Sequence, residues 1–443
     1  MTMKRPELLA PAGTLKNLRY AIAYGADAVY AGMPRYSLRV RNNDFASLGQ
    51  LQQGIDEVHQ AGKLFFLATN VLPHNAKVKT FMDDLAPIIE LQPDALIMAD
   101  PGLIMLVRER WPEVAVHLSV QANTVNYATV RFWQSLGLRR IILSRELSLE
   151  EIAEIRQLCP DIELEVFVHG ALCIAYSGRC LLSGYFNHRD ANQGSCTNSC
   201  RWEYGVKPAE QDLSGDVVLK DLTGSQTGNG QRHPASEQVY LIEEQERPGE
   251  LMPIEEDEHG TYIMNSKDLR AIEHVHRLTE MGIDSLKIEG RTKSHYYVAR
   301  TAQIYQRAID DAVAGRPFDP SLFASLENLA NRGYTDGFYQ RHHTQEYQNY
   351  LSNHSDSNRQ QFVGEVVGRD PLSGLVEIDV KNKFAVGDRL ELMLPQGNRD
   401  FTLTQMQNAK GEAMAEAPGG GYRVWVPLPD GPVEMGLLIK YLG

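Results

Sequence analysis

The sequence predicts an α/β protein built on a (β/α)8 barrel of the TIM type, with an acidic insertion between strands seven and eight and a small C-terminal all-β barrel domain. Three observations lead to this prediction. Eight short apolar runs alternate with segments of helical spacing, which is typical of a parallel sheet surrounded by its helices. A long acidic segment separates the last two runs. From residue 361 onward, short strand-like runs are separated by turn sequences.

The apolar runs are the expected barrel strands. They are Glu7–Ala10, Ala26–Ala31, Leu64–Asn70, Ala95–Ala99, Ala115–Val120, Arg140–Ser144, Leu164–His169 and Ser285–Glu289. The expected helices between them are Thr14–Tyr24, Leu48–Ala61, Val78–Leu91, Thr124–Leu136 and Leu149–Leu158. Ser148 stands before the last helix with Glu151 three residues later, which predicts a capping box. No Gly-x-Gly-x-x-Gly sequence follows the first strand, so an open dinucleotide-binding sheet is not favoured.

The segment 206–260 is acidic and lacks periodicity, so we expect a surface excursion with a short strand at Gln238–Ile242. Asn265 or Ser266 is the expected cap of a helix that runs to Met281, and a further helix is expected at Tyr296–Ala314. The resulting domains are a barrel over residues 1–340, a polar linker over 341–360 and the β domain over 361–443. The expected strands of the β domain are Gln361–Val367, Leu375–Val380, Arg389–Leu394, Phe401–Gln407, Tyr422–Pro427 and Leu437–Tyr441.

Charge is spread unevenly along the chain. The formal net charge is −13, but thirteen acidic and three basic residues between Pro208 and Gly260 leave only −3 for everything else. Net charge therefore neither excludes RNA as a partner nor indicates it. The N-terminus lacks the apolar run of a secretory signal, and no stretch has the length and apolarity of a membrane-spanning helix. We expect a cytoplasmic protein with no membrane partner, whose thiols stay reduced.

Four of the five cysteines follow the seventh predicted strand directly, with the spacing Cys-x6-Cys-x15-Cys-x3-Cys. These four are Cys173, Cys180, Cys196 and Cys200. Clustered thiolates indicate a metal centre, either an iron–sulfur cluster or zinc, although unliganded or catalytic thiols remain an alternative. The spacing matches neither ferredoxins nor the paired hooks of structural zinc sites. The fifth, Cys159, is expected to be an ordinary buried residue.

Barrel enzymes carry their chemistry at the carboxyl ends of the strands, where this chain has several functional residue types. The candidate catalytic residues are His169, Glu165 and Glu289. His169 is a candidate base or ligand, but a histidine held at the barrel rim by a hydrogen bond is the alternative that the residue type favours. The sequence contains no His-Glu-x-x-His, Gly-x-Ser-x-Gly or Gly-x4-Gly-Lys-Ser/Thr pattern, which leaves the zinc-protease, hydrolase and P-loop classes without support.

The segment EVFVHGALCIAYSGRCLLS, residues 165–183, resembles the signature of the collagenase-like peptidases, family thirty-two of the U class. Further stretches that resemble landmarks of this family are Glu7–Gly13, Asp27–Gly32, Ser119–Asn123, Ser144–Leu147 and Lys287–Arg291. With the C-terminal β domain, the resemblance covers essentially the whole chain and is greatest to the bacterial branch that hydroxylates tRNA. It implies an oxygen-independent hydroxylase with a [4Fe-4S] cluster on the four clustered cysteines. It further implies prephenate as co-substrate and conversion of the wobble uridine to 5-hydroxyuridine.

Prephenate carries two carboxylates, and bidentate capture of a carboxylate favours arginine. Arg145 and Arg291 are the expected prephenate ligands, and Arg35, Arg39 and Arg41 are candidates for an anion or an RNA phosphate. Ion pairs with rim carboxylates such as Glu289 are the alternative role for each of them. A basic arc at the barrel mouth is predicted to bind the tRNA anticodon loop, and its members are Arg35, Arg39, Arg41, Arg291, Lys293 and Arg300.

Three functional hypotheses follow from the sequence. The first is a cluster-dependent tRNA uridine hydroxylase, the second a collagenase-like peptidase, and the third a non-catalytic RNA-binding protein that presents tRNA to another enzyme. The missing nucleophile–base and zinc-protease patterns count against the second. The residues do not identify an electron donor.

Overall fold

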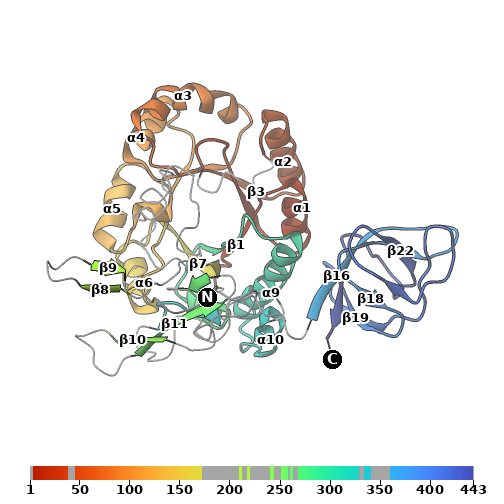
Figure 1. Ribbon diagram of the computed structural model, residues 1–443. Helices are drawn as coiled ribbons and strands as arrows, with labels where there is room; N and C mark the ends of the chain where they lie inside the picture. Colours follow the sequence, from red (N-terminus) through yellow and green to blue (C-terminus); the bar gives the residue numbers. More distant parts are fainter. Residues whose placement is uncertain are drawn as a thin grey trace.

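The computed structural model describes residues 3–37, 45–171, 268–327, 329, 334–340 and 360–442, and it describes parts of 209–262 as five short strands. Eight parallel strands close into a barrel ringed by helices, which confirms the predicted fold class (Figure 1). The barrel strands are β1 Glu7–Pro11, β2 Ala28–Gly32, β3 Leu64–Thr69, β4 Ala95–Met98, β5 Val116–Leu118, β6 Arg140–Ile142, β7 Glu163–Ala171 and β14 Ser285–Ile288. The barrel closes at β14, where Ser285 lies opposite both Glu7 of β1 and Glu165 of β7.

Every helix predicted between the first seven barrel strands is confirmed, and the described residues add two helices, at Pro101–Arg110 and Ser321–Glu327, that were not predicted. The helices are α1 Leu15–Ala23, α2 Leu48–Gln60, α3 Asn75–Ile89, α4 Pro101–Arg110, α5 Tyr127–Ser135, α6 Leu149–Leu158, α8 Val275–Glu280, α9 His295–Val313 and α10 Ser321–Glu327. The capping box of α6 is confirmed: Glu151 N donates to Ser148 Oγ at 3.3 Å, and Ser148 N donates to the Glu151 carboxylate at 2.9 Å. The sequence analysis did not name α4, although Asp100 and Pro101 carry its start signal as cap and first residue. None of the helices in the described ranges is long and apolar enough to cross a membrane.

The predicted helix up to Met281 is wrong in its first part. Asp268–Arg270 forms the strand β13, which pairs antiparallel with His169–Ala171 at the carboxyl end of β7. Helical structure begins only after it, with a 3-10 turn at Ile272–His274 and then α8. The reason is tertiary: β7 is longer than the other barrel strands, and its last residues offer backbone groups that β13 satisfies.

The acidic insertion contains more strand than the sequence predicts. Its strands are β8 Ala209–Gln211, β9 Val217–Leu219, β10 Tyr240–Glu243, β11 Leu251–Asp257 and β12 Gly260–Tyr262. β8 pairs with β9, and β11 pairs with β10 and β12, all antiparallel. The strand expected at Gln238–Ile242 corresponds to β10, shifted by up to two residues. The predicted linker at 341–360 lies outside the described residues, except for Gln360.

The C-terminal β domain is antiparallel throughout its described sheets and lies beside the barrel (Figure 1, blue). Its six-stranded sheet has the order β20 Arg399–Thr402, β19 Arg389–Met393, β23 Leu437–Tyr441, β16 Gln360–Arg369, β17 Val376–Val380 and β22 Arg423–Val426. Two further short strands, β18 Phe384–Ala385 and β21 Glu416–Ala417, pair with each other. The domain has its own apolar core, while Met393, Leu437 and Ile439 join the core of the barrel. The two parts therefore share buried surface.

Hydrogen bonds and a stacked pair of aromatic rings also join the barrel to the β domain. Tyr24, the residue that follows α1, donates its hydroxyl toward the carbonyl oxygens of Met393 at 3.0 Å and Met435 at 2.9 Å. Tyr296 of α9 stacks on Phe362 of β16 with ring centroids 4.9 Å apart. The helices α1 and α9 also pack against β1 of the barrel. The β domain therefore lies on the side of the barrel where β1 pairs with β14.

Candidate active site at the carboxyl end of the barrel

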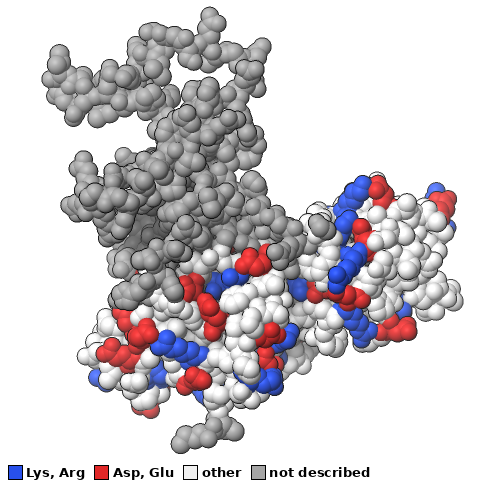
Figure 2. Space-filling view, turned by 90° about the horizontal axis from the view of Figure 1, so that it is seen from below, with Lys and Arg blue, Asp and Glu red and all other residues white. Residues whose placement is uncertain are grey.

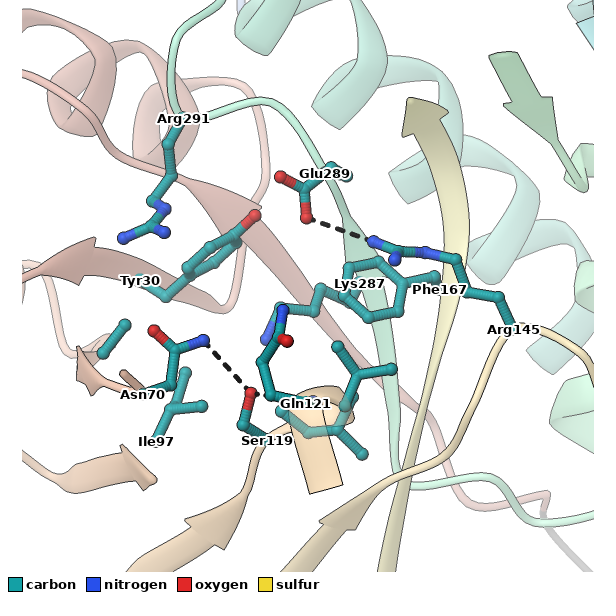
Figure 3. A pocket seen from close by; sticks show the side chains of 13 residues that line it. Tyr30, Asn70, Ile97, Ser119, Gln121, Arg145, Phe167, Lys287, Glu289 and Arg291 are labelled. Atoms are coloured by element: carbon teal, nitrogen blue, oxygen red, sulfur yellow. Dashed lines mark hydrogen bonds and ion pairs between the residues drawn. The ribbon is translucent and has the colours of Figure 1, made fainter. Parts of the chain in front are cut away.

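A polar pocket lies at the carboxyl ends of the barrel strands (Figure 3). Its described lining combines three cationic side chains, one carboxylate, amide and hydroxyl groups and two aromatic rings. The lining residues are Tyr30, Ala68, Asn70, Ile97, Ser119, Val120, Gln121, Ile142, Arg145, Phe167, Lys287, Glu289 and Arg291. They come from β2, β3, β4, β6, β7 and β14 and from the segments that follow β3, β5, β6 and β14. This position is where barrel enzymes bind substrates.

The upper part of the pocket brings Arg145, Glu289 and Arg291 together from two loops (Figure 3). Arg145 Nη2 lies 3.3 Å from Glu289 Oε2, and its guanidinium carbon lies 3.8 Å from the centroid of the Phe167 ring. Arg291 donates to Ser37 Oγ at 2.6 Å. The two arginines predicted to bind a carboxylate therefore line one pocket, and the ion-pair alternative also holds for Arg145.

Amide and hydroxyl groups line the opposite wall. Asn70 Nδ2 donates to Ser119 Oγ at 3.1 Å, and the backbone nitrogen of Gln121 donates to the same oxygen at 3.3 Å. Ser119 thereby starts the short 3-10 helix Val120–Ala122, which aims Gln121 at the cavity. Tyr30 donates its hydroxyl to the carbonyl of Ile288 at 3.0 Å, which fixes its ring as a wall.

Lys287 lies between the two aromatic rings of the pocket and is almost fully buried, at 3 % exposure. Its Nζ is 4.4 Å from the Tyr30 centroid and 5.4 Å from the Phe167 centroid, and it donates to Glu165 Oε1 at 2.7 Å. Burial lowers the pKa of Lys287 below its ordinary value, while the carboxylate of Glu165 opposes that shift.

A chain of ion pairs continues beneath Lys287 inside the barrel. Arg140 Nη1 lies 3.2 Å from Glu165 Oε2 and 2.7 Å from Glu7 Oε1, and Arg140 Nε lies 2.9 Å from Glu163. Burial raises the pKa of Glu7, although Arg140 opposes the shift. Glu165, predicted as a catalytic candidate, is fully buried and does not line the pocket, so it acts on the pocket only through its neighbours.

His169, another catalytic candidate, lies outside the pocket. Its ring contacts Tyr297, Tyr305 and Tyr334 at centroid distances of 5.5–5.7 Å, and Nδ1 lies 3.3 Å from the Tyr305 hydroxyl. Burial lowers the pKa of His169 to about 3, so the ring is neutral near pH 7. In a regular strand, alternate residues lie on the same face, so His169 would lie on the pocket side with Phe167. The pairing of β7 with β14 is irregular between Lys287 and Ile288, and this irregularity turns His169 away from the pocket. The rim-histidine alternative describes its surroundings better.

The basic arc predicted for RNA does not form from the described residues. Arg300 is 3 % exposed and pairs with Glu391 of the β domain, and Arg291 points into the pocket. Arg35 pairs with Asp84 at 2.9 Å, outside the pocket lining. Arg39 and Arg41 lie outside the described residues. On the face seen in Figure 2, Lys and Arg alternate with Asp and Glu, so the coloured surface there has no extended basic area.

The four clustered cysteines also lie outside the described residues. β7 ends at Ala171, and Cys173 follows two residues later in the sequence. Cys159 is buried in the barrel core, as predicted. Among described side chains, Glu273, His274 and Asp336 have ligand atoms close enough for a metal, but none of them lines the pocket.

Gly170 is needed where β7 passes the end of β14. Its φ is +107°, and a Cβ placed there would collide with the backbone carbonyl of Glu289. We expect Gly170→Ala to lower the free energy of unfolding by about 2–4 kcal/mol, from backbone strain and the forced shift of Glu289. Denaturant unfolding measures the change. The matched control is Gly49→Ala in α2, where a Cβ meets nothing within 4 Å; a loss there as large as at Gly170 would contradict this explanation.

Sequence reasoning did not identify several polar and aromatic residues of the pocket as site residues, namely Tyr30, Asn70, Ser119, Gln121 and Lys287. A signal existed for Lys287 and Glu165, because each is a charged residue between two apolar neighbours inside a predicted strand. Such residues are buried only when they are paired. The pairing of β14 with β7 places the two side by side.

The chain matches known proteins over its whole length. The model of peptidase family U32 matches residues 13–349, and the model of the peptidase family U32 C-terminal domain matches 358–440. The chain is 64 % identical to the tRNA hydroxylation protein P of Escherichia coli, over 97 % of this chain and 95 % of that protein. It is 58 % identical to the protein of the same name from Haemophilus influenzae, over 100 % and 97 %. A collagenase of Porphyromonas gingivalis is 26 % identical over 96 % and 95 %.

Proposed function

The chain belongs to peptidase family U32, and from this premise we propose that it is an enzyme that hydroxylates tRNA. The observation that carries the proposal is the 64 % identity, over 97 % of the chain, to a protein named for tRNA hydroxylation. The relative named collagenase is far less similar, at 26 % identity. The proposed reaction is oxygen-independent conversion of the wobble uridine to 5-hydroxyuridine, with prephenate as co-substrate.

The chemistry of the pocket supports an anionic co-substrate. Arg145 and Arg291 approach from the loops after β6 and β14, and a carboxylate between them accepts hydrogen bonds from two planar guanidinium groups. Asn70 and Gln121 supply amide groups on the facing wall. The aromatic rings of Tyr30 and Phe167 give the pocket flat apolar sides, which suit an unsaturated ring such as that of prephenate or a uracil.

The donor set fits an iron–sulfur cluster, since four thiols within one segment supply the ligands that a [4Fe-4S] cluster needs. Cys173, Cys180, Cys196 and Cys200 are the proposed ligands. When bound, such a cluster supplies electron transfer. The residues of the pocket orient the co-substrate and, being largely buried, exclude water from it.

The described lining of the pocket contains no nucleophile–base pair of the kind that a peptidase uses. Ser119 is its one serine among the described lining residues, and no histidine or cysteine accompanies it there. The Ser119 oxygen instead accepts hydrogen bonds from Asn70 and from the backbone of Gln121. Among the described residues of the pocket, no histidine is present to act as the general base that a serine nucleophile needs.

Mass spectrometry of tRNA nucleosides tests the proposal. We expect a strain that lacks this chain, grown without oxygen, to lose 5-hydroxyuridine and its derivatives from the wobble position, and the wild-type gene to restore them. Arg145→Met should not restore them, whereas Arg110→Met, on the outer helix α4, should do so fully. Unchanged wobble nucleosides in the deletion strain would refute the proposal. Full restoration by Arg145→Met would show that the reaction does not need Arg145.

A further inference from the structure

Lys287 is the most enclosed cation of the pocket. It comes from the middle of β14, not from a loop, and its backbone is paired on both sides, with β1 and with β7. Its position is therefore set by the barrel itself. Because strands of a closed barrel move less than loops, a group on β14 is better placed for orientation than the loop residues Arg145 and Arg291.

The hydrogen-bonding capacity of Lys287 is only partly used. An ammonium group has three N–H donors. Glu165 accepts one of them at 2.7 Å, and in the described part of the chain no second acceptor contacts Nζ. The faces of the Tyr30 and Phe167 rings flank the ammonium group. The side of the ammonium group that the rings do not cover is directed toward the cavity, which Lys287 lines.

The carboxylate of Glu165 is held in place by an ion pair deeper in the barrel. Its second oxygen pairs with Arg140, which also binds Glu7 of β1 and Glu163 at the start of β7. A carboxylate with fixed partners on both oxygens cannot rotate away, so the Nζ of Lys287 is held in one direction. The arrangement balances the charge of Lys287 while leaving its remaining donors directed at the pocket.

We propose that the ammonium group of Lys287 binds an oxygen of the anionic co-substrate at the floor of the pocket, and that Glu165 is the positioning residue that aims it. The identity of the ligand rests on the proposed function, whereas the binding itself can be measured without any tRNA reaction. Loss of one charge-assisted hydrogen bond weakens binding by at least about tenfold.

The experiment is calorimetric titration of prephenate into the purified full-length protein under anaerobic conditions. We expect Lys287→Met to bind at least about tenfold more weakly than the wild type. The double variant Lys287→Met/Glu165→Gln removes both charges, so it avoids the uncompensated carboxylate that could unfold the single variant. We expect it to remain as weak as Lys287→Met. The matched control is Lys63→Met, since Lys63 pairs with Asp27 at 3.2 Å just before β3, at the opposite end of the barrel.

The pH dependence of binding is a second readout, which the wild type alone provides. The charged groups that face Lys287 are Glu165, Glu289 and Arg291. The affinity for an anion should fall as the pH rises, because Lys287 loses its charge. Burial lowers the pKa of Lys287, so this fall should occur at a lower pH than it would for an exposed lysine. Glu165 favours the charged lysine, so in Glu165→Gln the fall should move to still lower pH.

The outcomes separate the inference from the proposed function. Binding by the double variant equal to that of the wild type would show that the Lys287–Glu165 pair is only structural. Absence of prephenate binding by the wild type would also overturn the inference. Binding that depends on Lys287, in a protein whose deletion leaves tRNA nucleosides unchanged, would refute the proposed function and leave the inference standing.

Discussion

Replacing Arg300 by Met is expected to lower the free energy of unfolding of the chain by about 3–5 kcal/mol. Arg300 of α9 forms a two-pronged ion pair with Glu391 of β19, with Nη1 to Oε1 at 3.0 Å and Nη2 to Oε2 at 2.5 Å. Both side chains are buried, at 3 % and 8 % exposure, where the β domain meets the barrel. The loss is large because the variant leaves the Glu391 carboxylate buried without its main counter-charge.

Denaturant unfolding followed by circular dichroism measures this change. The double variant Arg300→Met/Glu391→Gln should recover part of the stability, because no uncompensated charge remains. The matched control is Arg389→Met, whose partner Asp400 lies at 2.6 Å but whose pair is 65 % and 44 % exposed; it should cost less than about 1 kcal/mol. Equal effects of Arg300→Met and Arg389→Met would contradict a buried, shared interface between the barrel and the β domain.

The second large effect concerns the four clustered cysteines. If they hold the proposed cluster, protein purified without oxygen should contain about four iron atoms per chain and absorb visible light. We expect Cys196→Ala or Cys180→Ala to lose both the iron and the ability to restore wobble hydroxylation in the deletion strain. Metal analysis and the visible spectrum measure this directly.

Cys159→Ala is the control for these variants, because Cys159 lies in the barrel core next to α5 and α6. It should keep its iron and lose only a little stability from the lost packing volume. Stoichiometric zinc without iron in the anaerobic wild type would refute the cluster, and it would return the site to the zinc alternative that the cysteine spacing left open.

The barrel could be predicted from the sequence because every strand of it is a local apolar run. Each run from Glu7–Ala10 to Ser285–Glu289 corresponds to one barrel strand, with end points that differ by at most a few residues. Burial on both faces demands such runs in a parallel barrel, whatever their neighbours are. The cap at Ser148 could be predicted for the same reason, since its hydrogen bonds join residues three apart.

The site could be predicted in part. Arg145, Arg291 and Glu289 were identifiable because each lies at or just after the carboxyl end of a predicted strand, and the barrel rule brings such residues to one mouth. Arg300 was misplaced, because its helical position shows that it is on α9 but not that the β domain covers that face. The burial of its charge depends on a partner 91 residues away.

By itself, the sequence determined the barrel, the all-β character of the C-terminal domain and the family, since these depend on periodicity and on contiguous stretches of residues. Only the tertiary structure decided which side chains share the pocket. Lys287 and Glu165 meet because β14 closes the barrel against β7, and His169 leaves the pocket because the same pairing shifts its register. Asp268–Arg270 became a strand because β7 extends beyond its barrel neighbours. In each case the deciding contact joins residues more than ninety positions apart, and no local pattern encodes such a pairing.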